Sequence, residues 1–207
     1  MAIITRLIFK YVSLVKMTFS YYAKGKRSLI YKGMYKKKQA IKKVTLGKVF
    51  TTIENEKKYL TKLQPYGFTP KVYAYTENEI IMQFIKGKKI EEFLASALKQ
   101  KIKHVLKEII HQCRILDKLG IDKQEMSHPK KHILIAKSPT MIDFERSKFS
   151  LYPKNLTAFI QYLQSKKIQM LLEKKEIFLQ VPKEDLQRYK RNQNNFNYEE
   201  ILKNINF

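Results

Sequence analysis

The hydrophobic pattern changes partway along the chain from strand-like to helix-like, and this change constrains the fold more than any other feature. Before about residue 86, apolar residues occur in short runs divided by polar turns, as in antiparallel strands. From Glu91 to Leu119 they recur at three- and four-residue spacing, which predicts a long amphipathic helix. We therefore expect an α+β fold with two unequal lobes, the smaller rich in strands and the larger mostly helical.

Two hairpins and one helix are expected in the strand-rich part. Residues 28–33 and 39–44 have the composition of strands joined by a Lys-rich turn, and residues 72–75 and 80–85 of strands joined by the polar turn TENE. Between the hairpins, residues 50–63 carry an apolar stripe at helical spacing. Two prolines and a glycine follow this stripe and predict that the helix ends there.

The helical part is interrupted once. Gly120 predicts the end of the long helix, and residues 121–132 predict a structured loop. Residues 132–136 and 141–144 are two apolar runs that predict a further hairpin. The remainder is mostly helical in pattern, with a loop expected at residues 192–197 before a final helix.

These patterns divide the chain into three sections. Residues 1–22 form a basic amphipathic extension, residues 23–86 the N-terminal lobe and residues 87–207 the C-terminal lobe. Basic residues interrupt the extension too often for a transmembrane segment, and it lacks the cleavage site of a signal peptide. We expect the extension to pack on the rest of the protein rather than to contact a membrane surface.

The charge and the cysteine content bear on the partners and the compartment. The formal net charge is +24, and of the 42 basic residues 36 are lysines (42 minus 6 arginines). This charge attracts polyanions such as RNA or a ribosomal particle, but a lysine excess is also typical of a plain solvated surface, so both explanations stay open. The single cysteine, Cys113, excludes an internal disulfide and predicts a cytoplasmic protein with a buried thiol.

The strand-rich part contains segments that resemble those of protein kinases. Residues 25–33, GKRSLIYKG, resemble the loop that covers the phosphates of the nucleotide, which assigns Gly25 and Ser28 to cofactor binding. Residues 40–43, AIKK, resemble the strand that carries the nucleotide-binding lysine, with Lys42 in the lysine position.

Two further segments follow in the order of a kinase. Residues 55–63, NEKKYLTKL, resemble the helix whose glutamate pairs with that lysine, with Glu56 in the glutamate position. Residues 81–88, IMQFIKGK, resemble the link between the lobes where adenine meets the backbone, which assigns Met82 and Phe84 to the adenine site.

The catalytic segments of kinases also have counterparts. Residues 116–125, LDKLGIDKQE, resemble the approach to the catalytic loop, and residues 141–145, MIDFE, resemble the metal-binding aspartate segment. The resemblance runs from about Gly25 to Phe149 and is closest to the minimal atypical kinases. These are the RIO type, the KEOPS-associated kinase and the small predicted serine/threonine kinases of archaea.

The resemblance implies an ATP-dependent transfer of a phosphoryl group to serine or threonine of a protein, or of the chain itself. Lys42 would hold phosphate oxygens, Glu56 would orient Lys42, and Asp143 would bind Mg²⁺. Glu125 would orient the acceptor hydroxyl and accept its proton.

The sequence departs from the kinase pattern at three places. Glu125 stands where kinases have aspartate, and Asp122 is a candidate substitute. His132 stands where an asparagine binds metal, which favours Mn²⁺ over Mg²⁺, while Glu145 shares a face with Asp143 and can supply an oxygen ligand. Nothing after residue 149 resembles the segment on which ordinary kinases dock peptides.

Two other functions remain open from the sequence. The first is a nucleotide-binding pseudokinase that binds RNA or a ribosomal particle through its lysines; the second is a basic nucleic-acid protein with no nucleotide site. Each candidate residue also has a purely structural explanation: a surface lysine for Lys42, a capping carboxylate for Asp143, a solvated loop residue for Glu125 and a hydrogen-bonded strand residue for His132.

Overall fold

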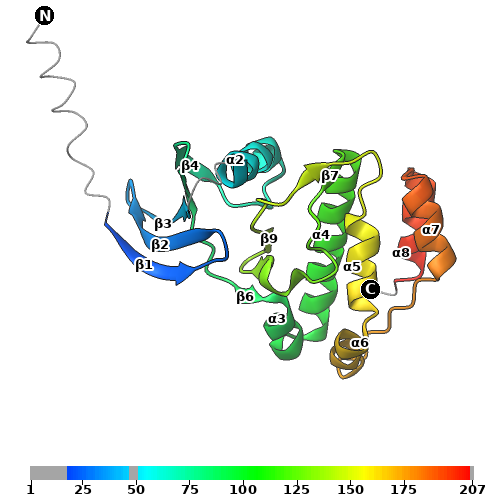
Figure 1. Ribbon diagram of the computed structural model, residues 1–207. Helices are drawn as coiled ribbons and strands as arrows, with labels where there is room; N and C mark the ends of the chain where they lie inside the picture. The colour runs from blue at the N-terminus through cyan, green and yellow to red at the C-terminus, as the bar shows by residue number, and fades with distance from the viewer. Residues whose placement is uncertain (1–17, 47–50, 206–207) are drawn as a thin grey trace, which may run out of the picture.

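A five-stranded antiparallel sheet forms the N-terminal lobe (Figure 1). The computed structural model describes residues 18–46 and 51–205. The strands lie in the spatial order β1-β2-β3-β5-β4. Their bounds are β1 Phe19–Lys24, β2 Ser28–Tyr35, β3 Lys38–Thr45, β4 Val72–Tyr75 and β5 Glu79–Gln83. Both predicted hairpins are confirmed by the antiparallel pairing of β2 with β3 and of β4 with β5.

One helix, α2 (Thr51–Leu63), packs against this sheet and contacts β3, β4 and β5. Its apolar stripe includes Ile53, Leu60 and Leu63, which are at most 1% exposed. A short 3₁₀ turn, Gln64–Tyr66, follows and ends at Gly67 in the left-handed conformation. The helix therefore forms where the sequence predicts it, because burial of its apolar face stabilises it.

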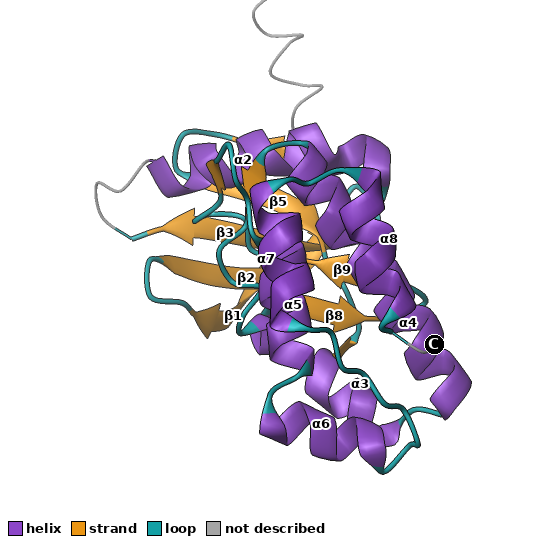
Figure 2. Ribbon diagram, turned by 90° about the vertical axis from the view of Figure 1, so that its right-hand side faces the viewer, coloured by secondary structure: helices purple, strands orange, loops and turns teal. Residues whose placement is uncertain are grey.

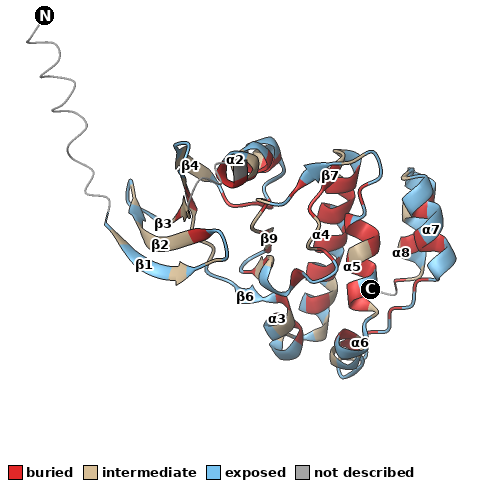
Figure 3. Ribbon diagram, in the orientation of Figure 1, coloured by how far each residue is buried: buried red, intermediate tan, exposed pale blue. Residues whose placement is uncertain are grey.

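The C-terminal lobe is a set of helices with α4 and α5 side by side at its centre (Figures 1 and 2). These two helices carry more buried residues than any other two described helices of the lobe, ten on α4 and seven on α5; Figure 3 shows them in red. Cys113 of α4 is fully buried, as predicted. The helices are α3 Ile90–Ser96, α4 Lys99–Lys118, α5 Asn155–Leu163, α6 Lys166–Glu173, α7 Lys183–Arg191 and α8 Asn195–Lys203.

Short strands connect the helical lobe to the cleft. β7 (Ile121–Asp122) pairs with β10 (Lys148–Phe149). β8 (Ile133–Ile135) lies between β6 (Lys88–Lys89) and β9 (Pro139–Met141) in a second small sheet. These pairings fix both ends of the loop at residues 123–132 and of the segment at residues 142–147, which carry the candidate catalytic residues.

Several predicted boundaries were wrong. The long helix is two helices, because Ala97 and Leu98 are extended between α3 and α4 and Leu98 is 81% exposed. The strand predicted at residues 141–144 ends at Met141, since Asp143 has a positive φ of 63°. The predicted loop at residues 192–197 is half helix, because the Asn194 side chain accepts a hydrogen bond from Asn197 N and begins α8.

The predicted N-terminal extension also overlaps the sheet. β1 begins at Phe19, so residues 19–22 belong to the N-terminal lobe rather than to the extension. The rest of the predicted amphipathic helix, residues 1–17, lies outside the described residues. None of the helices that the structure describes combines the length and hydrophobicity that a membrane span requires.

Candidate active site

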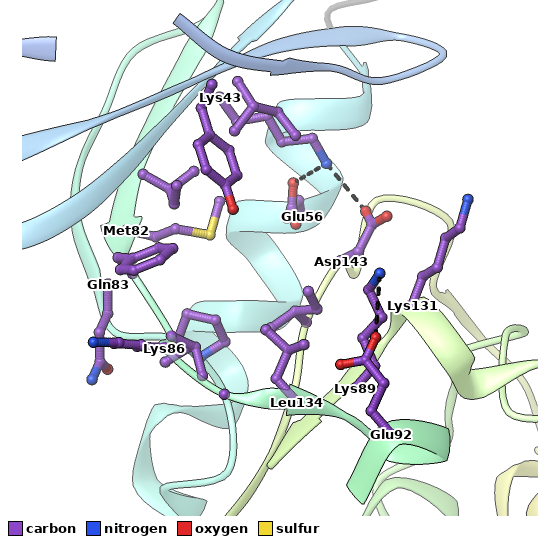
Figure 4. A pocket seen from close by; sticks show the side chains of 18 residues that line it. Lys43, Glu56, Met82, Gln83, Lys86, Lys89, Glu92, Lys131, Leu134 and Asp143 are labelled. Carbon is purple, nitrogen blue, oxygen red and sulfur yellow. Dashed lines mark hydrogen bonds and ion pairs between the residues drawn. The ribbon is translucent and has the colours of Figure 1, made fainter. Parts of the chain in front are cut away.

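The ammonium group of Lys43 lies among three carboxylates at the junction of the lobes, and Figure 4 shows two of them, Glu56 and Asp143. Lys43 Nζ is 2.8 Å from Glu56 Oε2, 3.1 Å from Asp143 Oδ1 and 2.9 Å from Glu145 Oε2. Lys43 comes from β3, Glu56 from α2, and the other two from the segment after β9. Three elements far apart in sequence therefore converge on one cation.

The prediction that Lys42 pairs with Glu56 was wrong by one residue. Successive side chains of a strand point to opposite faces of the sheet, so a shift of one residue reverses the face. Lys42 lies on the opposite face, 3.9 Å from Glu79 and 5.3 Å from the ring centroid of Tyr31. The prediction matched Ala40, Ile41 and Lys42 of AIKK to the kinase motif. In the structure, Ile41 and Lys43 are the residues of this segment that line the cleft. An apolar residue stands two positions before each lysine, Ala40 before Lys42 and Ile41 before Lys43, so the strand pattern did not distinguish them.

Burial and charge together set the ionisation of this cluster. Burial by itself lowers the pKa of Lys43, but the three carboxylates raise it above its usual value. Burial also raises the pKa of Asp143, yet Lys43 and Lys123 outweigh this and leave that pKa below its usual value. Glu56 is 1% exposed, and burial raises its pKa against the opposing effect of Lys43. Lys43 and Asp143 are therefore charged at neutral pH.

The backbone at Asp143 is held in a sparsely populated conformation. Its φ of 63° lies in the left-handed region, which aspartate tolerates better than most residues. Both neighbours are fixed: Ile142 N donates to His132 O at 2.9 Å, and Phe144 N donates to Glu56 Oε1 at 3.3 Å. These bonds turn the Asp143 carboxylate towards Lys43 instead of into the sheet.

Lys123 is a fully buried lysine that sequence analysis missed. Its Nζ donates to Asp143 O at 2.8 Å and to Glu125 Oε2 at 3.4 Å, and lies 4.6 Å from the ring centroid of Phe144. Burial lowers its pKa, and Glu125 and Asp143 oppose that effect. In a chain with 36 lysines nothing in the local sequence distinguished this one. The lysine ties the loop at residues 123–132 to the Asp143 segment.

Glu125 lies in the same loop with two cationic neighbours. Its carboxylate is 3.4 Å from Lys123 Nζ and 4.0 Å from Arg146 Nε, and its side chain is 11% exposed. Burial raises the pKa of Glu125, and the nearby Lys123 partly offsets the rise. Asp122, the candidate substitute, is buried in β7 and accepts a hydrogen bond from Gln124 N, so it stabilises the turn.

His132 contributes its imidazole next to the carboxylates. His132 Nδ1 lies 3.8 Å from Asp143 Oδ2, and this buried nitrogen has no hydrogen-bond partner among the described residues. Burial and the charge of Lys123 lower the pKa of His132 to about 4, so the ring is neutral at pH 7. The described carboxylates offer an oxygen set within 4.8 Å of one another, from Glu56, Asp143 and Glu145. Glu56 thus joins the predicted ligands Asp143 and Glu145, whereas the predicted ligand His132 lies outside this oxygen set, beside Asp143.

An elongated cleft leads away from this cluster. One hollow of about 510 Å³ extends from Lys43 to the link between the lobes, and its apolar walls include Ile30, Ile41, Met82, Leu134 and Ile142 (Figure 4). Phe84 lies at the link, as the sequence predicted for the adenine end. Gly87 allows close approach there, because a Cβ on it would lie 2.9 Å from the Ile135 backbone.

A second hollow of about 330 Å³ lies at the other end of the cluster. The turn at residues 25–28 covers it, closed by a hydrogen bond from Gly25 N to Ser28 O at 2.8 Å. Lys43, Glu125, His132 and Asp143 line the same hollow. All predicted site residues except Lys42 therefore line the cleft or its charged end.

The antiparallel lobe, the helical lobe and the lysine–glutamate pair at an apolar cleft define a protein-kinase-like fold. Residues 9–147 match the RIO domain family, so the chain belongs to the RIO-type atypical kinases. No curated protein matches the sequence.

Solved structures of a RIO kinase share the fold. The crystal structure of the Rio2 kinase from Chaetomium thermophilum superposes with a TM-score of 0.62 at 15% identity, covering 94% of this chain and 74% of that one. The Rio2 kinase–ADP/Mg²⁺–phosphoaspartate complex from the same organism gives a TM-score of 0.60 at 14% identity, with 95% and 72% covered. At this identity the similarity is one of fold.

Proposed function

We propose that this protein is an ATP-dependent kinase that transfers the γ-phosphoryl group to serine or threonine of a protein, or of its own chain. The observation that carries the proposal is the position of Lys43 Nζ, bonded to both Glu56 and Asp143 at the end of an apolar cleft. Phosphoryl transfer requires positioning and charge neutralisation above all, and this arrangement supplies both. We also propose a cytoplasmic location, on the basis of the single, buried, unpaired Cys113.

The three carboxylates fit a divalent cation by the chemistry of their oxygens. Glu56, Asp143 and Glu145 all face Lys43 Nζ, and Glu145 also lies 3.8 Å from Arg27 Nη1. Their oxygens are the ligands that Mg²⁺ prefers, and the unpaired nitrogen of His132 would favour Mn²⁺. A metal bound there would neutralise phosphate charge. We assign Asp143 and Glu145 as its principal ligands and keep Glu56 as the partner of Lys43.

The remaining residues act at the two ends of the phosphate chain. Lys43 binds phosphate oxygens, and Glu56 holds it in the cleft. The turn with Gly25 and Ser28 covers the phosphates. Glu125 orients the acceptor hydroxyl and takes its proton, and its raised pKa brings it nearer to the working pH of a general base.

The net charge of +24 favours a second function, nucleotide-dependent binding of RNA or a ribosomal particle. In this alternative the protein is a pseudokinase. Glu125 and His132, which stand where kinases have aspartate and asparagine, would then have no catalytic role.

One assay tests both functions. Thermal melting is measured with ATP and either Mg²⁺ or Mn²⁺, for the wild type and Asp143→Asn, while transfer of radiolabelled γ-phosphate is followed. Saturation at a hundred times the dissociation constant stabilises a protein by about 2.7 kcal/mol, which shifts the melting temperature by several degrees. A kinase gives a metal-dependent shift and label transfer, both lost in the variant. A shift without transfer favours the pseudokinase, and no shift with either metal excludes the nucleotide site.

A further inference from the structure

Three large apolar side chains are exposed within four residues, shortly after the Asp143 segment. Phe149, Leu151 and Tyr152, which we call the apolar patch, are 67%, 77% and 64% exposed. Elsewhere in the described residues, exposed large apolar side chains occur singly along the sequence or, at Tyr21 and Tyr22, as a pair of lower exposure. A cluster of exposed apolar groups on a soluble domain marks an interaction site more often than a random surface.

The backbone beneath the patch is fixed. Phe149 pairs with Ile121 across the β10–β7 ladder, and Ser150 N donates to Gly120 O at 2.9 Å. The Phe149 ring packs so closely on Gly120 that a Cβ there would lie 2.6 Å from it. Tyr152 N donates to Ser150 Oγ at 3.1 Å. Such a preordered surface loses little conformational entropy when it binds a partner.

The patch continues from the acceptor end of the candidate active site. Arg146, three residues before Phe149, places its Nε 4.0 Å from Glu125 Oε1. Asn55 of α2 donates to the carbonyls of Glu145 and Ser147, at 2.9 and 2.8 Å, and so ties this segment to the N-terminal lobe. The patch therefore follows directly along the chain from a neighbour of Glu125.

The rim of the patch is cationic. No acidic residue occurs between Arg146 and Leu172, and Lys148 and Lys154 are exposed on either side of the patch. Lys62 reaches Leu119 O, next to Gly120, from the neighbouring helix. An apolar surface within a cationic rim is complementary to an apolar side chain in an acidic segment.

We propose that the apolar patch docks an acidic, apolar segment of the protein acceptor and brings its hydroxyl to Glu125. The docking stands independently, whereas the delivery to Glu125 rests on the proposed kinase function. The patch would then take the part of the peptide-docking segment that ordinary kinases carry after their metal-binding aspartate.

The test measures binding and transfer separately, with dephosphorylated β-casein as an acidic acceptor and myelin basic protein as a basic one. Binding to the immobilised full chain is followed by biolayer interferometry. The variant Leu151→Ser/Tyr152→Ser removes two anchors that make no core contact, and Lys148→Glu/Lys154→Glu reverses the rim. The matched control Phe178→Ser/Phe196→Ser removes side chains of 67% and 66% exposure from elsewhere in the helical lobe.

The wild type should bind casein and not the basic protein, and both patch variants should weaken that binding by about tenfold or more, while the control leaves it unchanged. The proposal is overturned if the Leu151→Ser/Tyr152→Ser variant binds casein as tightly as the control does. It is also overturned if the wild type prefers the basic protein. The proposal is also overturned if the wild type self-associates and the patch variant does not, because a second copy of the chain would then occupy the patch. Patch-dependent binding without an ATP-induced thermal shift would retain the docking site and reject the kinase function.

Discussion

The two ends of the cleft differ in how closely they follow the kinase pattern. At the end that we propose binds the nucleotide, Lys43, Glu56, Asp143 and the apolar walls match the kinase pattern, with Lys43 in place of Lys42. At the acceptor end, Lys123, Glu125 and His132 form a cluster with its own chemistry. Under the proposed function the first end binds ATP, which is common to kinases, and the second end binds the acceptor particular to this protein. We therefore infer that the residues at the second end determine the acceptor.

The variant Glu125→Gln tests the acceptor end most strongly. It keeps the size of the side chain and removes the base, so kcat for phosphoryl transfer should fall by ~10²–10⁴ while ATP binding is unchanged. Transfer is measured with radiolabelled ATP, and binding by thermal shift. Asp122→Asn, in the adjacent strand, is the comparison. If that variant loses transfer and Glu125→Gln does not, the base is Asp122 and the account of the loop is wrong.

A neighbouring pair of lysines tests the nucleotide end. Lys43→Met should lower kcat/KM by ~10²–10³, because it removes a preorganised cation from the phosphate site. Lys42→Met should have no comparable effect, since Lys42 lies on the other face beside Glu79. Both are measured in the same steady-state assay. Equal losses in the two variants would mean that the register of β3 does not decide which lysine acts.

The buried lysine of the acceptor end should affect folding as well as activity. Lys123→Met removes the buried cation from Glu125, which keeps only the more distant Arg146, and from the carbonyl of Asp143, so the free energy of unfolding should fall by about 3 kcal/mol. Urea denaturation measures the change. Lys118→Met, at an exposed position of α4, is the control and should change stability by less than about 0.5 kcal/mol. A loss for Lys123→Met as small as that of the control would contradict its role as the link between the two segments.

The same comparison shows what the sequence could predict. Hydrophobic period and turn residues were sufficient for both hairpins, α2 and the division into a strand-rich and a helical part. They could not locate Lys43, because two adjacent lysines in a strand differ only in the face to which they point. Nor could they identify Lys123, since its burial depends on contacts with Glu125, Asp143 and Phe144 that form only in the folded chain. The break at Leu98 was missed because apolar residues keep their helical spacing through this position. The helix itself nevertheless ends at Ser96, and a second helix begins at Lys99.

A buried carboxylate in the helical lobe provides the last test, as a counterpart to Glu56. Asp117 accepts hydrogen bonds from Asn155 N and Nδ2 and from Leu156 N at the start of α5, and from the Tyr189 hydroxyl of α7, all of them neutral donors. Glu56, by contrast, has the ammonium group of Lys43. Burial raises the pKa of Asp117 to about 6, and these hydrogen bonds only partly offset the rise.

The raised pKa of Asp117 fixes the sign of its effect on stability. A carboxyl with a higher pKa in the folded than in the unfolded state favours folding when protonated, so its contribution is complete below about pH 4 and is lost as the pH rises through 6. From the two pKa values the loss is about 3 kcal/mol by pH 7.

Urea denaturation of the wild type and Asp117→Asn between pH 4 and pH 8 isolates this contribution, because the other groups titrate alike in both. The wild type should lose stability relative to the variant as the pH rises. A difference between them that is independent of pH would show that the neutral donors keep the pKa of Asp117 at its ordinary value.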